Sequence, residues 1–375
     1  MLDKFPNLFI TSYQEIRGFV GDPVKIELVE GAKPVRQKLR RMGKEQMNAL
    51  MEEVDKLLNA GFIMPVDNAE WVSPVVVTPK KDGRWRVCID YKPLNAATKK
   101  DPYPLPFIDQ LLDAVVGFER YSVCDGYSGY FQLILALEDW KKTTFITPWG
   151  CFCFLCLPFG LTNGPGDFER KVDWVFKPFL GKFVKGFIDD FCVYSSQKEH
   201  VQKLEMTFAR YDECGGQLNP KKCHLAQPKV KLLGHVISEN GIEADPEKVE
   251  ALLLLSSPED TRQLATFIQK VKYLSQFIHL ASQLLYPLQQ AVKKDPLEWT
   301  HECEDVFDKV KEVLSTLPIM QAPDWKKEFY VNLSVGDDAI GAMLLQIGKE
   351  SQYMKPVHYS SRVKTLHEGI IQRLS

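Results

Sequence analysis

The sequence predicts an α+β protein with more than one compact unit. Between residues 121 and 211, a short strand, a helix, a β-hairpin and a second helix follow one another, which is close to a split β-α-β plan. Beyond Gly241 the apolar residues recur at helical spacing, and from Glu328 onward strand-like runs return. These observations place an antiparallel sheet in the first part of the chain and a helical unit after it.

Composition restricts the class of protein. Of 375 residues, 45% are hydrophobic and 26% are charged, which is typical of globular chains, and no apolar run reaches membrane-spanning length. The N-terminus lacks a secretory signal and the nine cysteines form no disulfide framework, so we expect an intracellular, cytoplasmic protein with no membrane partner. A net charge of -2 alone argues against a nucleic-acid partner, but the local distribution of charge matters more.

The N-terminal part combines extended and regular segments. Residues before Lys44 look loop-rich and end in a basic stretch, 33–41, whose simplest explanation is a solvated arm. Apolar residues at spacings of three and four predict an amphipathic helix from Lys44 to the stop signal Gly61. Strands are then expected at 71–78 and 84–89, joined by a turn with basic residues at its tip.

Two adjacent carboxylates, Asp189 and Asp190, interrupt two β-prone runs within residues 186–196. The pattern is that of a hairpin with acid at its tip, and an ordinary aspartate turn would explain it on its own. Neighbouring carboxylates repel one another, however, and holding them between apolar strands is costly unless a cation neutralises them. A third carboxylate, Asp125, follows the predicted strand 121–124, so the three can meet at one end of a sheet.

The remaining elements follow from the same patterns. We expect a last strand at 230–237 to complete the sheet that carries the carboxylates. Asp260 and Gln263 form a cap pair for a helix that continues to Ile278. Further on, the pattern predicts one helix at 306–317 and strands at 329–333, 340–346 and 356–359.

One cysteine cluster is a candidate zinc site, namely Cys151, Cys153 and Cys156. These cysteines alternate with Phe152 and Phe154, as residues of a packed strand would. No second group of ligands with zinc-site spacing accompanies them, so packing explains them better than zinc does.

An ordered series of short motifs runs along nearly the whole chain. Its first members are Ser73-Pro74-Val75-Val76, Lys80-Lys81-Asp82-Gly83 with Trp85-Arg86, Asp90-Tyr91 with Leu94-Asn95, and Tyr103-Pro104-Leu105-Pro106. Its later members are Asp125 with Ser128-Gly129-Tyr130, Leu157-Pro158-Phe159-Gly160-Leu161-Thr162-Asn163 with Pro165, Ile188-Asp189-Asp190, Lys222-Cys223, and Leu233-Gly234-His235. The series resembles the reverse transcriptases of gypsy-type long-terminal-repeat retrotransposons.

This resemblance implies a right-hand polymerase fold, with fingers, a ferredoxin-like palm and a helical thumb. The implied regions are fingers mainly at 1–105 and 140–160, palm mainly at 106–139 and 161–239, and thumb at 240–322. Residues 323–375 would form a connection or the truncated start of a ribonuclease H-like domain. The chain would then be one part of a retrotransposon polyprotein, located in the virus-like particle of the element.

The resemblance also implies the reaction. The chain would be an RNA-directed DNA polymerase, also able to copy DNA, that extends a primer with deoxynucleoside triphosphates. Asp125, Asp189 and Asp190 would hold two Mg²⁺ ions, with Mn²⁺ as a substitute, because phosphoryl transfer asks the protein mainly for positioning and charge neutralisation. An RNA or DNA template with its primer would be the partner, and the oligomeric state stays open.

Further residues take roles implied by the family. Lys80 and Arg86 would grip the triphosphate. Tyr130 would be the steric gate that excludes a ribose 2′-hydroxyl, although an aromatic side chain packed under the sheet would look the same in sequence. Lys222 would be a candidate for protonating pyrophosphate. The other candidates for binding the nucleotide are Phe159, Phe187 and Ile188.

The chain departs from the family pattern beside the catalytic motifs. Phe187 stands where tyrosine is usual, and Gly164, Gly166 and Asp167 replace the usual alanine, alanine and threonine. These changes favour an alternative, a domesticated or decayed copy that binds nucleic acid without polymerising. The three carboxylates and Tyr130 favour the polymerase, and a metal-dependent nuclease would leave the other motifs unexplained.

A second departure lies near the end of the chain. Ser334 falls where the family carries its first ribonuclease H aspartate. Asp337 and Asp338 are close in sequence but come after the predicted strand rather than on it. Because two-metal hydrolysis needs several carboxylates around one phosphate, we expect no ribonuclease H activity.

Overall fold

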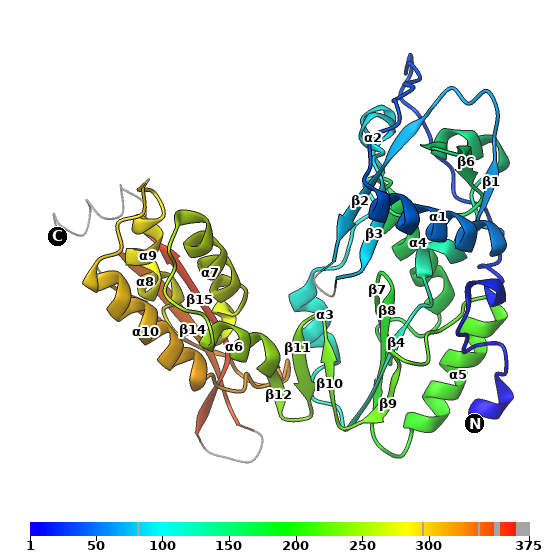
Figure 1. Ribbon diagram of the computed structural model, residues 1–375. Helices are drawn as coiled ribbons and strands as arrows, with labels where there is room; N and C mark the ends of the chain where they lie inside the picture. Colours follow the sequence, from blue (N-terminus) through cyan, green and yellow to red (C-terminus); the bar gives the residue numbers. More distant parts are fainter. Residues whose placement is uncertain (81–82, 295, 337, 349–352, 365–375) are drawn as a thin grey trace. The chain divides into compact units, whose positions relative to one another are not determined.

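The computed structural model describes residues 1–80, 83–294, 296–336, 338–348 and 353–364 (Figure 1). Three residues named above, Lys81, Asp82 and Asp337, lie outside these ranges. The chain forms two compact units, the first from Met1–Phe107 and Tyr121–Gln227, the second from Ile108–Arg120 and Pro228–Ser375.

A four-stranded sheet in the order β7-β8-β4-β9 lies at the centre of the first unit (Figure 1). Its strands are β4 (Arg120–Asp125), β7 (Val184–Phe187), β8 (Asp190–Ser195) and β9 (His224–Gln227). The predicted strand and the predicted acidic hairpin are therefore neighbours in one sheet, with β4 beside β8.

Two amphipathic helices cover this sheet, α4 (Gly164–Phe176) and α5 (His200–Glu213). Their buried apolar side chains recur at helical spacing, namely Phe168, Val172, Val175 and Phe176 on α4 and Leu204, Phe208 and Tyr211 on α5. Val201, which the periodicity places on the same face of α5, is instead 57% exposed. The ring of Phe176 stacks on Tyr211 with centroids 5.6 Å apart and tilts against Phe191 of β8 at 4.7 Å. Fully burying an aromatic or aliphatic side chain of this size stabilises the fold by about 1.5–3 kcal/mol.

The prediction of a single strand at 230–237 was wrong. The segment forms two strands, β10 (Lys229–Leu232) and β11 (His235–Ser238), which pair antiparallel. Between them Leu233 and Gly234 have φ angles of 48° and 74°, so both adopt the left-handed conformation of a two-residue hairpin turn. A leucine in this conformation gives no turn signal in the sequence, which is why the run looked continuous.

The hairpin belongs to the second unit, where β12 (Gly241–Ala244) extends it to a three-stranded sheet. The edge position in the sheet with the carboxylates goes instead to β9, which pairs antiparallel with β4 through Val123 and His224. The sequence of β9 is short, mostly exposed and has no alternating apolar pattern, so periodicity could not identify it.

A five-stranded sheet in the order β1-β6-β5-β2-β3 forms the other half of the first unit. Its strands are β1 (Ile63–Pro65), β2 (Ser73–Pro79), β3 (Trp85–Ile89), β5 (Phe145–Thr147) and β6 (Gly150–Phe154). Helix α1 (Lys44–Asn59) buries Leu50, Val54 and Leu57, and α2 (Lys92–Ala97) follows β3. The predicted helix after Lys44 and the predicted basic-tipped hairpin are both confirmed.

The second unit is mainly helical. Its helices are α3 (Ile108–Val115), α6 (Pro246–Leu253), α7 (Thr261–Tyr273), α8 (Ala281–Leu284), α9 (Tyr286–Ala291) and α10 (His301–Ser315). Asp260 accepts a hydrogen bond from the Gln263 backbone N–H at 2.6 Å, so the predicted cap of α7 is confirmed. The helix ends at Tyr273, earlier than expected, and a 3-10 turn at Ser275–Phe277 carries the next buried aromatic side chain.

A three-stranded antiparallel sheet ends the described chain, in the order β13-β14-β15. Its strands are β13 (Tyr330–Val335), β14 (Ala339–Ile347) and β15 (Met354–Val363), as the sequence predicted with shorter bounds. Within the described ranges, every helix is too short or too polar to cross a membrane.

Close packing of α4 on β7 gives a first prediction. A Cβ atom added to Gly186 would lie 2.5 Å from Cγ1 of Val172, a distance that real side chains do not reach. Gly186→Ala should therefore lower the free energy of unfolding by about 1–3 kcal/mol, measured by urea denaturation. Adding Val172→Ala removes the obstructing methyl groups, so the double variant should be more stable than the sum of the two single losses. Purely additive losses would show that the two positions do not touch.

Candidate active site

The acidic tip of the β7–β8 hairpin is a two-residue turn. Phe187 pairs with Asp190, which leaves Ile188 and Asp189 as the turn residues. Ile188 has a φ angle of 52°, in the left-handed region that a β-branched side chain rarely adopts. The surroundings must therefore stabilise this turn, because the isoleucine itself disfavours it.

The backbone of the turn is held from two sides. The Ile188 N–H donates to Oε2 of Glu169 on α4 at 2.7 Å. The Gly126 N–H, one residue after β4, donates to the backbone oxygen of Asp189 at 2.8 Å. The second bond ties the turn to the chain directly after Asp125, so the ends of β4 and of the hairpin are held together.

The structure brings the three predicted carboxylates into one neighbourhood. The carboxyl groups of Asp125 and Asp190 are hydrogen-bonded, and Asp189 interacts electrostatically with both. Nζ of Lys222 lies 3.0 and 3.2 Å from the two carboxylate oxygens of Asp125. The predicted proton donor is therefore an ion-pair partner of one predicted metal ligand.

Burial and mutual repulsion shape the electrostatics of the site. Burial, and then the charges of Asp125 and Asp190, raise the pKa of Asp189 to about 6. Burial and the nearby Asp125 likewise raise the pKa of Asp190 to about 6, and Lys222 opposes the shift in both groups. Among the side chains that the structure describes, Oδ1 of Asp189 is buried without a hydrogen-bond partner. An unsatisfied buried acceptor is costly, and a cation would satisfy it.

The donor set suits a hard divalent cation, since carboxylate oxygens are the ligands that Mg²⁺ prefers. Throughout the described ranges, however, no three His, Cys, Asp or Glu side chains are gathered closely enough to hold a metal ion between them. The Lys222 ammonium lies on Asp125. Burial raises the pKa of each thiol in the cysteine cluster, Cys151, Cys153 and Cys156, which disfavours the thiolates that zinc needs.

A glycine makes room for the unpartnered oxygen. A Cβ atom on Gly129 would lie 2.6 Å from Oδ1 of Asp189 and 2.8 Å from the ring of Phe168. Only glycine fits between the carboxylate and the aromatic ring at this point. The sequence offered Gly129 as part of a motif, but the close approach becomes visible only in the fold.

Tyr130 lies in an aromatic stack beside the aspartates. It is 8% exposed, its ring stacks on Phe168 with centroids 5.6 Å apart, and the ring of Phe159 lies at 4.7 Å. Burial, with the charge of Asp189, raises the pKa of its hydroxyl to about 12. A Cβ atom on Gly164 would come within 3.0 Å of the Tyr130 ring, so this departure from the family leaves the ring extra space.

The remaining predicted residues differ in their exposure and in the sheet that carries them. Phe159 is 53% exposed, and Phe187 is half-buried next to the turn. Lys80 and Arg86 belong to the β2–β3 hairpin of the five-stranded sheet, where Arg86 is exposed opposite Thr78. They are therefore carried by a different sheet from the aspartates.

Sequence reasoning missed Glu169. This residue is 2% exposed, although glutamate is seldom buried unless it has a partner. The signal was present in the sequence, because Glu169 shares its helix face with Val172 and Phe176, three and seven positions later. A single acidic residue within an apolar stripe indicates a specific buried partner.

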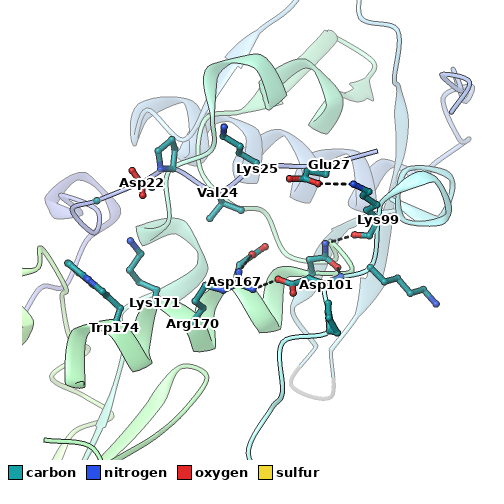
Figure 2. A pocket seen from close by; sticks show the side chains of 15 residues that line it. Asp22, Val24, Lys25, Glu27, Lys99, Asp101, Asp167, Arg170, Lys171 and Trp174 are labelled. Atoms are coloured by element: carbon teal, nitrogen blue, oxygen red, sulfur yellow. Dashed lines mark hydrogen bonds and ion pairs between the residues drawn. The ribbon is translucent and has the colours of Figure 1, made fainter. Parts of the chain in front are cut away.

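A separate cavity of about 780 Å³ opens between the N-terminal segment, the loop around Lys99 and helix α4 (Figure 2). Its charged side chains pair with one another, Glu27 with Lys99 at 3.4 Å and Asp101 with Arg170. The three aspartates are not part of its lining. The catalytic candidates therefore lie outside this cavity.

Comparisons with known proteins indicate the family. Residues 78–237 match the family "Reverse transcriptase (RNA-dependent DNA polymerase)", and residues 299–372 match "RNase H-like domain found in reverse transcriptase". The Transposon Tf2-3 polyprotein of Schizosaccharomyces pombe is 30% identical over 320 residues, which cover 85% of this chain and 24% of that polyprotein. The Retrovirus-related Pol polyprotein from transposon 297 of Drosophila melanogaster is 28% identical over 98% of this chain and 35% of its own length.

Solved structures show the same fold. The foamy viral protease-reverse transcriptase in complex with dsDNA has a TM-score of 0.88 at 21% identity, covering 98% of this chain and 76% of that one. The same viral enzyme in complex with an RNA/DNA hybrid has a TM-score of 0.86 at 20% identity, covering 100% of this chain and 52% of that one. The predicted right-hand polymerase fold with a ribonuclease H-like segment is confirmed.

The chain spans between about a quarter and a third of the length of the polyproteins that it matches. The family model, the transposon relatives and the solved structures agree with one another. Residues 78–237 belong to the reverse transcriptase family, and the chain as a whole is similar to the polyproteins of long-terminal-repeat retrotransposons.

Proposed function

We propose that this chain is an RNA-directed DNA polymerase that also copies DNA templates and extends a primer with deoxynucleoside triphosphates. The observation that supports this most directly is the buried, unpartnered oxygen of Asp189 beside Asp125 and Asp190. A site that brings carboxylates together at such cost needs a positive charge, and the divalent ions that accompany a triphosphate would supply it. The polyprotein of the element, in its cytoplasmic virus-like particle, is the proposed setting.

Asp125, Asp189 and Asp190 would hold Mg²⁺, with Mn²⁺ as a substitute. When bound, two such ions would help deprotonate the primer 3′-hydroxyl and neutralise the leaving pyrophosphate. Lys222 has to leave Asp125 for the ion to bind there, since its ammonium contacts both oxygens. Although burial opposes its charge, the contact with Asp125 raises the pKa of Lys222, so its amine is protonated before the ion displaces it. Lys222 would then be a candidate for protonating pyrophosphate.

The nucleotide would lie against the aromatic stack. Tyr130 would face the sugar and exclude a 2′-hydroxyl, with Phe159 at the base of the nucleotide or template. Lys80 and Arg86 would grip the triphosphate from the β2–β3 hairpin, since a cation on each side of the γ-phosphate suits its charge. Phe187 and Ile188 would lie beside the primer end, next to the turn.

The proposed regions of the right hand follow the elements. The β1-β6-β5-β2-β3 sheet with α1 would be the fingers, the β7-β8-β4-β9 sheet with α4 and α5 the palm, and the helices from α6 to α10 the thumb. The partner would be a template with its primer, because the solved relatives are complexes with dsDNA and with an RNA/DNA hybrid. The basic stretch 33–41 and the β2–β3 tip would supply phosphate contacts.

Ribonuclease H activity is proposed to be absent. Ser334 lies on β13 opposite Gly341, and by resemblance it occupies the position of the family's first ribonuclease H aspartate. Asp338 lies in the connection between β13 and β14 rather than on a strand. The competing function, nucleic-acid binding without polymerisation, is favoured by Gly164 and Gly166, because two glycines in the first turn of α4 cost about 1 kcal/mol each in helix stability.

Primer extension on an RNA template with magnesium distinguishes the two functions. The wild-type chain should extend the primer, and Asp189→Asn should lower the rate about a hundredfold to a thousandfold, the loss typical of removing one charge-stabilising group. The matched control is Asp55→Asn on the exposed face of α1, which should leave the rate unchanged. Inactivity of the wild-type chain despite tight template-primer binding would favour the non-polymerising alternative.

Sugar discrimination tests the role of Tyr130. Tyr130→Val should raise the efficiency ratio of ribonucleotides to deoxynucleotides about tenfold or more, because the site for a 2′-hydroxyl becomes vacant. The matched control is Phe62→Val, which removes a buried ring that packs against Tyr13 and Phe131. An equal ratio in all three proteins would assign Tyr130 to packing alone.

Stability without metal should depend on pH through Asp189. The pKa of Asp189 is raised in the folded state, so the folded chain binds the proton more tightly than the unfolded chain does. The free energy of unfolding therefore falls as the pH rises from about 4 to about 6, and it stays at the lower value above pH 6. Asp189→Asn should be more stable than wild type by about 1–2 kcal/mol at pH 7.5, a difference that falls to about a third at pH 4.5 and vanishes only near pH 3. Thermal unfolding in chelator measures this; the same difference at both pH values would contradict the raised pKa.

A further inference from the structure

Glu169 is a buried charged group for which the proposed reaction has no role. It lies on the apolar face of α4, where it is 2% exposed. A buried carboxylate is costly unless a donor compensates it. That donor is the backbone N–H of Ile188, 2.7 Å from Oε2.

The turn needs this acceptor. In a two-residue hairpin turn, the N–H of the first turn residue points away from the ladder and finds no partner within the hairpin itself. Ile188 also adopts a φ angle of 52°, which costs an isoleucine about 1–2 kcal/mol relative to its ordinary conformations. Without Glu169, the turn would keep both a strained residue and a partly buried, unsatisfied donor.

The turn also sets the direction in which the Asp189 carboxylate points. Asp189 follows Ile188 directly, and its Oδ1 fits against Gly129 with no space for a Cβ atom. On its other side the Asp189 backbone oxygen accepts from Gly126. A rotation of the peptide before Asp189 would therefore move the carboxylate away from Asp125.

We propose that Glu169 is a positioning residue, which acts through the Ile188 N–H to fix the turn that aims Asp189 at the divalent cation. The proposal rests on the proposed polymerase function for its activity readout. It assigns Glu169 no contact with nucleotide, metal or nucleic acid. The next turn of α4 is also held in place, because the Tyr103 hydroxyl donates a hydrogen bond to Asp173, four residues after Glu169.

The test compares two substitutions of nearly equal shape. Glu169→Gln keeps an oxygen that accepts from Ile188, whereas Glu169→Met removes the acceptor. The Met variant should lose about tenfold to a hundredfold in kcat, the size of loss that small misplacements of a reacting group produce, with KM for deoxynucleotide little changed. The Gln variant should retain wild-type kcat within a few fold.

A second readout needs no activity. Mn²⁺ affinity of the chain alone, measured by electron paramagnetic resonance, should weaken in Glu169→Met and stay unchanged in Glu169→Gln. If the wild-type chain does not extend primers but this difference in affinity is found, the positioning role stands and the polymerase proposal fails. If Glu169→Met keeps both kcat and Mn²⁺ affinity while its melting temperature falls, Glu169 serves packing alone and the inference is overturned.

Two further variants keep the test decisive. Ile188→Gly relieves the left-handed strain, so in the Glu169→Met background it should recover part of the lost Mn²⁺ affinity. If Glu169→Met does not fold, Glu169→Asp replaces it, because the shorter side chain withdraws the acceptor from Ile188. Wild-type kcat and Mn²⁺ affinity in Glu169→Asp would then overturn the proposal.

Discussion

Repulsion among Asp125, Asp189 and Asp190 is the constraint on which the rest of the first unit depends. Burial removes the water that would screen the three charges, and the pKa of Asp189 and of Asp190 rises to about 6 as a result. In this structure Lys222 forms its ion pair with Asp125, and one oxygen of Asp189 has no partner among the described residues. Without a cation, the repulsion among the carboxylates and the unpartnered oxygen therefore destabilise the site. This property is expected of a phosphoryl-transfer centre.

Helix α4 supplies most of the contacts that hold the three aspartates close together. It supplies the acceptor for Ile188, the ring of Phe168 against Gly129, and the Val172 side chain against Gly186. Each contact is short enough that no larger residue fits at the two glycines. Substitutions on the buried face of α4 should thus act on the aspartates through the turn, although none of these side chains would touch a substrate.

Much of this arrangement could be predicted from sequence. The helices α1, α4 and α5 and the acidic hairpin have clear periodicity, because each buries one face against a sheet. The convergence of the carboxylates followed from the order of elements. By contrast, the turn at Leu233 and the edge strand at His224 depend on tertiary context, since neither has a local signal. The ion pair of Lys222 and the hydrogen bond of Glu169 depend on side-chain positions that spacing alone does not give.

Anomalous X-ray diffraction at the manganese edge, from crystals soaked in Mn²⁺, would locate a cation among the carboxylates. We expect a manganese peak coordinated by oxygens of Asp125 and Asp189, with Asp190 beside it and the Lys222 ammonium displaced from Asp125. Crystals of Asp189→Asn should show a much weaker peak at that position. A wild-type map without a peak among the three carboxylates, with Lys222 still on Asp125, would show that these aspartates are not a metal site.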